Sequence, residues 1–365
     1  MNQKKERIYY LDAMRGVLMM LGVFLHSAQV FNPAKGWIIY SEDSSILSAY
    51  LVDIIHTFRM PAFFIVSGYF CLLTIKRYGP DNFLNIRIKR IVIPLIITAL
   101  TLNSIQTYIL TKYGWISFNL ETYLTEGEWV SHLWFLNNLI IYFLFAYFFA
   151  RFFSKSISSL NSLIERPVRK IPFISIIFIL PLIWISIKIM GKMGFPLYIE
   201  LFGFLQLYDI FLYLPYFLFG IWLRGNENYL DKFSSINPII SIILMTIFYF
   251  ISEAISQKES MLNNIINEYS KNIIIWFAAS LCFYIFKKFT NKHSKFFYFL
   301  SDASYSVYLF HNVIVIILGI ILINNNIGGT LGLVITIVST CLISFFIHHY
   351  FISKVATAKY LFNGK

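Results

Sequence analysis

Charged residues are scarce in this chain. Only 13% of its 365 residues are charged, whereas 58% are hydrophobic and the mean hydropathy is +0.67. Soluble domains typically carry about 25% charged residues, so this composition excludes an ordinary soluble protein. It predicts an all-α integral membrane protein instead.

Cysteine is also rare. Cys71, Cys282 and Cys341 all fall inside apolar segments, which excludes a disulfide framework. No C-x-x-C or His/Cys spacing of a metal site occurs, so we expect no metal. We expect no cleavable signal peptide either, because Asp12 and Arg15 interrupt the first apolar stretch, which we interpret as a retained helix.

Acidic residues are few as well: 18 Asp and Glu face 30 Lys and Arg, for a net charge of +12. An excess of this kind can indicate nucleic-acid binding. Here, however, the basic residues lie in short loops between apolar runs, so we expect membrane lipids around the chain and no nucleic-acid partner. No linker, low-complexity segment or internal repeat separates a second domain, and residues 1–365 are predicted to form a single membrane domain.

Ten apolar runs approach the roughly 20 residues that a membrane-spanning helix needs. They cover residues 14–32, 51–75, 91–110, 133–153, 172–190, 205–223, 237–255, 271–289, 304–323 and 331–352. Lys and Arg concentrate in alternate loops, so both termini are predicted to face the cytoplasm. The predicted inner loops contain Lys4, Lys5, Arg7, Lys76, Arg77, Arg87, Lys89, Arg90, Arg151, Lys155, Arg166, Arg169, Lys170, Arg224, Lys232, Lys287, Lys288, Lys292 and Lys295.

The first apolar run carries one arginine and one histidine, Arg15 and His26. Eleven helical positions separate them, which places them on nearly the same face and roughly 16 Å apart along the axis. Ionisable groups inside membrane helices are costly and usually face a polar interior. The pair therefore indicates two ends of one polar site. Alternatively, Arg15 reaches the lipid headgroups and His26 is an ordinary interior histidine.

The second run places Asp53, His56 and Arg59 at i, i+3 and i+6, near the predicted outer surface and at the depth of His26. We interpret them as substrate-binding residues, although an interfacial ion pair between Asp53 and Arg59 is an alternative. Ser67 is a further candidate, and with Gly68 it permits close approach of another helix.

A basic cluster precedes the third run, in a segment that we expect to be the loop entering that helix. Arg87 and Arg90 lie one helical turn apart, with Lys89 beside them. Guanidinium groups bind phosphate oxygens in bidentate fashion, so the cluster suits a phosphate-bearing ligand. Ordinary anchoring at the inner membrane surface explains the same pattern.

Further candidates lie at the fourth and ninth runs: His132 and Trp134 at the outer start of one, and His311 inside the other. We interpret His348 and His349 as interfacial and His293 as a loop residue, all three structural. A histidine in a cavity with a basic mouth is what acyl transfer from a coenzyme thioester requires. The imidazole can take the proton of an acceptor hydroxyl, and no metal is needed.

Several motifs occur in order along the chain: Arg15 and His26 in LDAMRGVLMMLGVFLHS, FRMPAFFIVSGY, the Arg87-x-x-Arg90 pair, SHLWFL and SYSVYLFH. This arrangement resembles the membrane acyltransferase-3 family, from about residue 8 to the C-terminus. Within the family, IYYLDAMRG, DIIHTFRM, LYLPYFLFG and KYLFNGK are most similar to the members that succinylate periplasmic glucans. The ninth run reads His311-Asn312, where the resemblance leads us to expect a second histidine.

The resemblance implies a ten-helix bundle in a bacterial inner membrane, acting as an acyltransferase. It would take an acyl group from cytoplasmic acyl-CoA, with succinyl-CoA favoured, and pass it to a glycan hydroxyl outside. His26 would be the catalytic histidine and Arg15 its essential partner, with Arg87 and Arg90 near the coenzyme. An O-acetyltransferase of lipopolysaccharide or exopolysaccharide sugars is one alternative. A transporter of acyl groups or glycans is another, although the chain lacks the repeat symmetry common in transporters.

Overall fold

The computed structural model describes residues 8–153, 170–257 and 260–365. The long helices are α1 (Tyr9–Val30), α2 (Ile46–Tyr78), α7 (Trp134–Phe152), α9 (Phe173–Lys192), α10 (Leu207–Gly225), α12 (Pro238–Ser256), α13 (Met261–Thr290), α14 (Lys295–Asn324) and α15 (Gly329–Phe346). The short helices are α3 (Pro80–Arg87), α4 (Ile93–Thr98), α5 (Ser104–Lys112), α6 (Leu120–Thr125), α11 (Glu227–Phe233) and α16 (Ala356–Asn363). Lys4, Lys5, Arg7, Lys155, Arg166 and Arg169, assigned above to inner loops, lie outside the described residues.

Four short helical segments and a hairpin complete the architecture. The segments η1 (Ile88–Val92), η2 (Ala99–Asn103) and η4 (Ile347–Ile352) are π-helical, and η3 (Ser131–Leu133) is a 3-10 turn. Strands β1 (Glu200–Leu201) and β2 (Leu205–Gln206) pair antiparallel just before α10.

Among the described residues, ten helical runs are long and apolar enough to cross a membrane. Each overlaps one of the ten predicted runs, so the prediction of an all-α membrane protein is confirmed. The third run is Pro80–Lys112, built from α3, η1, α4, η2 and α5. The eighth begins at Met261, ten residues before the predicted start at residue 271, so the polar stretch that includes Glu268 is part of α13.

The segment that carries Arg87 and Arg90 is helical, so its prediction as a loop is wrong. A new helix begins at Pro80 after Gly79 turns the chain with φ of 79°. Proline removes a helical N–H and crowds the carbonyl four residues earlier, and Pro94 lies just past the π-helical η1. The π-helical turn of η1 lies just before Pro94, and the chain continues as helix α4 through that proline.

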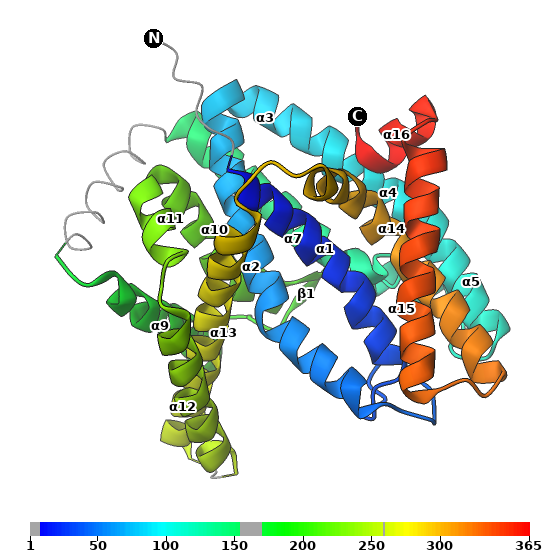
Figure 1. Cartoon of the computed structure of the whole chain (residues 1–365), viewed down its shortest axis with the longest axis horizontal. Coiled ribbons are helices and arrows are strands. Elements are labelled where there is room, and N and C mark those ends of the chain that lie inside the picture. The colour runs from blue at the N-terminus through cyan, green and yellow to red at the C-terminus, as the bar shows by residue number, and fades with distance from the viewer. Residues whose placement is uncertain (1–7, 154–169, 258–259) are drawn as a thin grey trace.

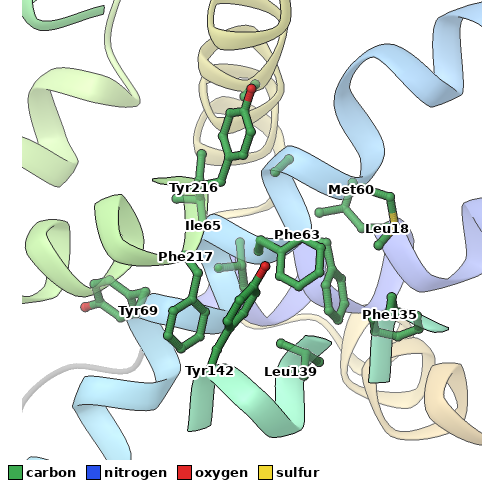
Figure 2. Close-up of a cluster of buried hydrophobic side chains, with 14 of the residues drawn as sticks. Leu18, Met60, Phe63, Ile65, Tyr69, Phe135, Leu139, Tyr142, Tyr216 and Phe217 are labelled. Carbon is green, nitrogen blue, oxygen red and sulfur yellow. The ribbon is translucent and has the colours of Figure 1, made fainter. Parts of the chain in front are cut away.

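The centre of the bundle is formed by α1, α2, α10 and α14 (Figure 1), with α1 packed on α14 and α2 on α10. At the second contact a Cβ on Gly68 would lie 2.0 Å from the Phe217 carbonyl oxygen. The predicted close helix approach at Gly68 is therefore confirmed. Around it gathers a cluster of buried apolar side chains from α1, α2, α7 and α10 (Figure 2), among them Phe63 and Phe135.

The helix α12 lies at the edge of the bundle, against α13 (Figure 1). Its apolar side chains are largely exposed: 65% for Ile239, 52% for Ile243 and 65% for Phe250. A helix with an apolar exposed surface suits lipid rather than water as its surroundings. In contrast, α14 is the most enclosed of the ten spans, so its polar side chains lie inside protein.

Candidate active site

A cavity opens at the end of the bundle where α1 begins and α16 ends. Its polar wall includes Arg15, Arg87, Arg90, Asp302 and Lys365. Four of these five side chains are cationic and one is a carboxylate, so the cavity carries an excess of positive charge. Its floor is apolar and includes the core residues Phe63 and Phe135 drawn in Figure 2.

Arg15 is fixed to the side of the cavity. Its Nη2 atom donates a hydrogen bond to Ser301 Oγ on α14 at 3.0 Å and lies 3.8 Å from the Asp12 carboxylate. Its guanidinium also lies 5.2 Å from the centre of the Phe70 ring. The side chain keeps 41% of its surface exposed, so Arg15 can reach a ligand in the cavity while remaining anchored to α14.

Arg87 and Arg90 both line this cavity, but they differ in their contacts. Arg87 lies against the rings of Phe83 and Phe143, at 5.2 and 4.6 Å, and its Nη2 atom donates to Thr74 Oγ1 at 3.3 Å. Arg90 is exposed. Arg87 is therefore partly a packing residue, whereas Arg90 is available to an anion from the cavity.

The cavity extends inward to Met19, Ser304 and Phe135. Beyond it stands Tyr308, which packs on Phe135 with ring centres 4.7 Å apart and donates a hydrogen bond to the His132 carbonyl at 2.6 Å. On its other side lie the rings of His132 and His311, at 5.4 and 5.6 Å. The rings of Phe135 and Tyr308 thus lie between the basic cavity and a group of histidines.

His26 belongs to this group. Its ring centre lies 5.2 Å from that of His311, and on the other face it stacks on Trp37 at 5.6 Å. Its Nδ1 atom lies 2.9 Å from Gln29 Oε1. An amide oxygen only accepts hydrogen bonds, so Nδ1 carries the proton and Nε2 keeps its lone pair. His26 is held in the tautomer that a general base needs.

His311 has the same arrangement inside the bundle. Its Nδ1 atom donates to the Tyr308 carbonyl at 2.6 Å, and its Nε2 atom has no hydrogen-bond partner among the described residues. His132 packs edge-on against it at 5.4 Å. Asn312, at the position where a second histidine was expected, instead donates to Gln106 Oε1 at 2.7 Å, so it braces the neighbouring helix.

Arg59 enters the same group from α2 and is 7% exposed. Its Nε atom donates to the Leu18 carbonyl at 3.1 Å. A Cβ on Gly22 would lie 2.9 Å from Arg59 Nη2 and 3.4 Å from His311 Nε2. The missing side chain at Gly22 therefore makes room for a guanidinium and an imidazole beside the turn of α1 that precedes His26.

The three polar residues of α2 do not share one environment. Asp53 and His56 are exposed, whereas Arg59 is buried and bonded to the Leu18 carbonyl. Among the described residues no ion pair joins Asp53 to Arg59, so the interfacial pair considered above is not found. His56 is close enough to His26 to interact with it electrostatically. Only Arg59 is buried in the histidine group, and Asp53 and His56 lie at its outer approach.

The other predicted site residues separate into two regions. Ser67 lines the basic cavity, together with Arg15. Trp134 packs on Tyr213 of α10 at 5.6 Å, beside the histidine group rather than in it. Gln29, Trp37 and Gly22 were missed by the sequence interpretation. Gln29 lies three residues after His26, a helical spacing that could have predicted their contact. For the loop residue Trp37 the sequence offers no such spacing.

His348 is not interfacial as predicted, because it is 3% exposed. Its Nδ1 atom lies 3.1 Å from Ser306 Oγ and its Nε2 atom 3.8 Å from the Asp302 carboxylate. Because η4 packs on α14, the His348 side chain is buried against that helix, whereas His349 beside it is exposed. Within the described ranges, no three His, Cys, Asp or Glu side chains are grouped so as to hold a metal ion.

The helical membrane bundle thus brings a basic cavity close to a buried group of histidines and an arginine, an arrangement compatible with a membrane-embedded acyltransferase. Comparison with known families agrees: the acyltransferase-3 family model, described as an acyltransferase domain, matches residues 8–349. The chain therefore belongs to this acyltransferase family, and it is an enzyme of that class.

Individual relatives are similar over nearly their whole length. Glucans biosynthesis protein C of Escherichia coli strain K12 is 25% identical over 388 aligned positions, covering 99% of this chain and 95% of the relative. The protein of the same description from Escherichia coli O81 strain ED1a is also 25% identical, over 386 positions and with the same coverage. No solved structure matches the chain.

Proposed function

We propose that this enzyme transfers an acyl group, with succinyl favoured, from cytoplasmic acyl-CoA to hydroxyls of a periplasmic glucan. The observation that carries the proposal is the arrangement along α14. Ser301 contacts Arg15 at the basic cavity, and His311 contacts His26 in the histidine group. The two regions are linked by ring contacts, because Phe135 lines the cavity and packs on Tyr308, which in turn packs on His311.

The donor is assigned to the basic cavity. Coenzyme A carries phosphate groups at one end and the thioester at the other. Arg15, Arg87 and Arg90 would bind the phosphates, since guanidinium groups match phosphate oxygens. The apolar floor around Phe63 and Phe135 suits the uncharged arm, and this places the thioester end toward Tyr308 and the histidine group.

The acceptor hydroxyl is assigned to the opposite side, at His26. Gln29 contacts the Nδ1 atom of His26, so the Nε2 atom can take the hydroxyl proton as the oxygen attacks the thioester carbon. Arg59 stabilises the negative charge that develops on the carbonyl oxygen. The carbon–sulfur bond then breaks, the ester remains on the sugar, and the coenzyme thiolate recovers the proton from His26.

The succinyl group is favoured because its free carboxylate needs a cation near the reacting carbon. Arg59 supplies one inside the histidine group, and His56 lies at its outer approach. Lys35, a further cation in the loop after α1, forms an ion pair with Glu42 and lies over the Tyr40 ring at 5.5 Å. It is therefore engaged elsewhere, and Arg59 is the stronger candidate.

The name that the relatives share refers to glucan biosynthesis, which supports a glucan acceptor. The ten helical spans support a location in a membrane, for which we propose the bacterial inner membrane. The outer approach to His26 includes Trp37, Tyr40 and Trp115, with Tyr40 and Trp115 edge-on at 5.5 Å. Aromatic side chains of this kind present flat apolar faces to sugar rings. They support a carbohydrate acceptor on that side.

Mass spectrometry of periplasmic glucans tests the proposal, in cells with the gene, without it, and with His26→Ala. We expect succinyl groups only in cells with the unaltered protein. His349→Ala is the matched control and should keep succinylation, because His349 is exposed and its ring contacts Tyr350 rather than the histidine group. Full succinylation by His26→Ala would overturn the catalytic assignment.

The same experiment separates the alternatives. Acetyl groups found instead on lipopolysaccharide or exopolysaccharide, and lost with the gene, would identify an O-acetyltransferase of those sugars. Export of an unmodified acyl group or glycan, with no ester formed by the purified protein, would identify a transporter.

A further inference from the structure

The last residues of the chain form part of the basic cavity. Asn363, at the end of α16, and Lys365 both line it, together with Arg15 and Arg90. Figure 1 shows α16 folded back across the end of the bundle, beside α4 and α14. Residues 363–365, called the strap below, thus lie across the mouth of the proposed donor site.

An ion pair and a hydrogen bond hold the strap to α14. Lys365 Nζ pairs with Asp302 Oδ1, and Ser306 Oγ donates to Asn363 Oδ1 at 3.3 Å. The buried His348 contacts both Ser306 and Asp302 from the other side. The Asp302 carboxylate is therefore braced by His348 while it holds the lysine.

A close backbone contact holds the strap to the segment that carries Arg90. Gly364 has φ of 60°, a conformation that side chains disfavour, and a Cβ there would lie 2.0 Å from the Lys89 carbonyl oxygen. The strap thus joins α14 to η1 and completes the wall between Asp302 and Arg90. Any side chain at position 364 would force the two apart.

We propose that the strap is a phosphate-binding element of the donor site, with Lys365 as the binding residue and Asp302 as its positioning residue. The Lys365 ammonium has three donors. One is directed to Asp302, and with the side chain 35% exposed the others are free to bind phosphate oxygens in the cavity. The inference rests on the proposed function, because it takes coenzyme A as the ligand of this cavity.

The test compares donors with and without phosphates, using purified full-length protein in detergent. Acyl-CoA carries a diphosphate, whereas the corresponding S-acyl-pantetheine carries none. Lys365→Met should raise the KM for acyl-CoA about tenfold, as expected for loss of one charge-assisted hydrogen bond, and leave kcat within a few fold. The kinetic constants for acyl-pantetheine should stay unchanged, and Lys365→Arg should retain most of the affinity for acyl-CoA.

Two further variants examine how the strap is held. Asp302→Asn should raise the KM for acyl-CoA without affecting acyl-pantetheine, because an unanchored lysine binds less well. Gly364→Val should have the same selective effect by moving the strap away from Lys89. Lys354→Met is the matched control, since Lys354 lies near the same end of the bundle but does not line the cavity.

The outcomes separate this inference from the proposed function. If the unaltered protein neither binds coenzyme A nor uses acyl-CoA, the proposed donor is wrong. If it does both, and Lys365→Met changes neither, the strap assignment is wrong. Equal losses with the two donors would indicate a structural role only. A selective loss of bound phosphatidylglycerol, with coenzyme A binding unchanged, would assign Lys365 to a lipid headgroup and also overturn the inference.

Discussion

The imidazole rings of His26 on α1 and His311 on α14 lie 5.2 Å apart, and each is held by a hydrogen bond at Nδ1. Both Nε2 atoms are therefore left as acceptors. Since His311 Nε2 has no partner among the described residues, the two rings present a pair of proton acceptors close to Arg59. The predictions below follow from this relationship and from its neighbours.

If the two histidines act as one unit, their substitutions will not be additive. General base catalysis contributes roughly 10²- to 10⁴-fold, so we expect His26→Ala to lower kcat by that order. His311→Ala should cause a smaller loss, and the double variant should match His26→Ala alone. Multiplicative losses in the double variant would mean that the rings act independently. The measurement is a double-mutant cycle on kcat with purified enzyme.

Gln29 is expected to position His26 and not to bind substrate. Gln29→Leu removes the acceptor for Nδ1–H, which costs about 0.5–1.5 kcal/mol, or up to roughly tenfold. That loss should appear in kcat, with KM for both substrates unchanged. Gln29→Glu restores an acceptor oxygen and should recover most of the rate. A raised KM for the glycan in Gln29→Leu would instead indicate direct contact with the acceptor.

Gly22→Ala should inactivate the enzyme without unfolding it. The added methyl group would lie 2.9 Å from Arg59 Nη2 and 3.4 Å from His311 Nε2, so the guanidinium must move from its place in the histidine group. Loss of a preorganised oxyanion donor costs about 10²- to 10³-fold in kcat. Gly225→Ala is the control, because a Cβ there would meet nothing within 4 Å. Thermal unfolding in detergent should show both variants folded.

Arg90 and Arg87 are expected to differ in what their loss affects. Arg90→Met should raise the KM for acyl-CoA and leave the melting temperature unchanged, because Arg90 is exposed at the cavity. Arg87→Met should raise the KM for acyl-CoA and also lower the melting temperature. Its guanidinium packs between the rings of Phe83 and Phe143, and losing about 1 kcal/mol of such contacts in a chain of this length lowers Tm by about 1–2 °C. Equal melting temperatures for the two variants would contradict this distinction.

Much of the fold was predictable from composition alone. The ten spans were found because a membrane helix is a local property: about 20 apolar residues satisfy their own backbone hydrogen bonds in lipid. The errors lie at helix ends. Polar residues such as Glu268 and Arg87 continue a helix beyond its apolar run, and hydropathy cannot detect that extension.

The site was predictable only along single helices. Helical periodicity placed Arg15 and His26 on one face of α1, and both contact α14. The same reasoning put Asp53, His56 and Arg59 together, yet only Arg59 is buried. How far a side chain enters a site depends on the helices packed against it, and periodicity carries no information about those neighbours.

By itself, the sequence determined that this protein is a ten-helix membrane bundle and which ionisable residues its spans contain. The tertiary structure decided which of those residues meet. His26 faces His311 from a span nearly 300 positions away, Arg59 fits over Gly22, and Lys365 reaches Asp302 at the cavity. These contacts depend on how close the helices approach and on which small residues permit it. Packing between distant segments sets both, whereas local sequence sets only the helices themselves.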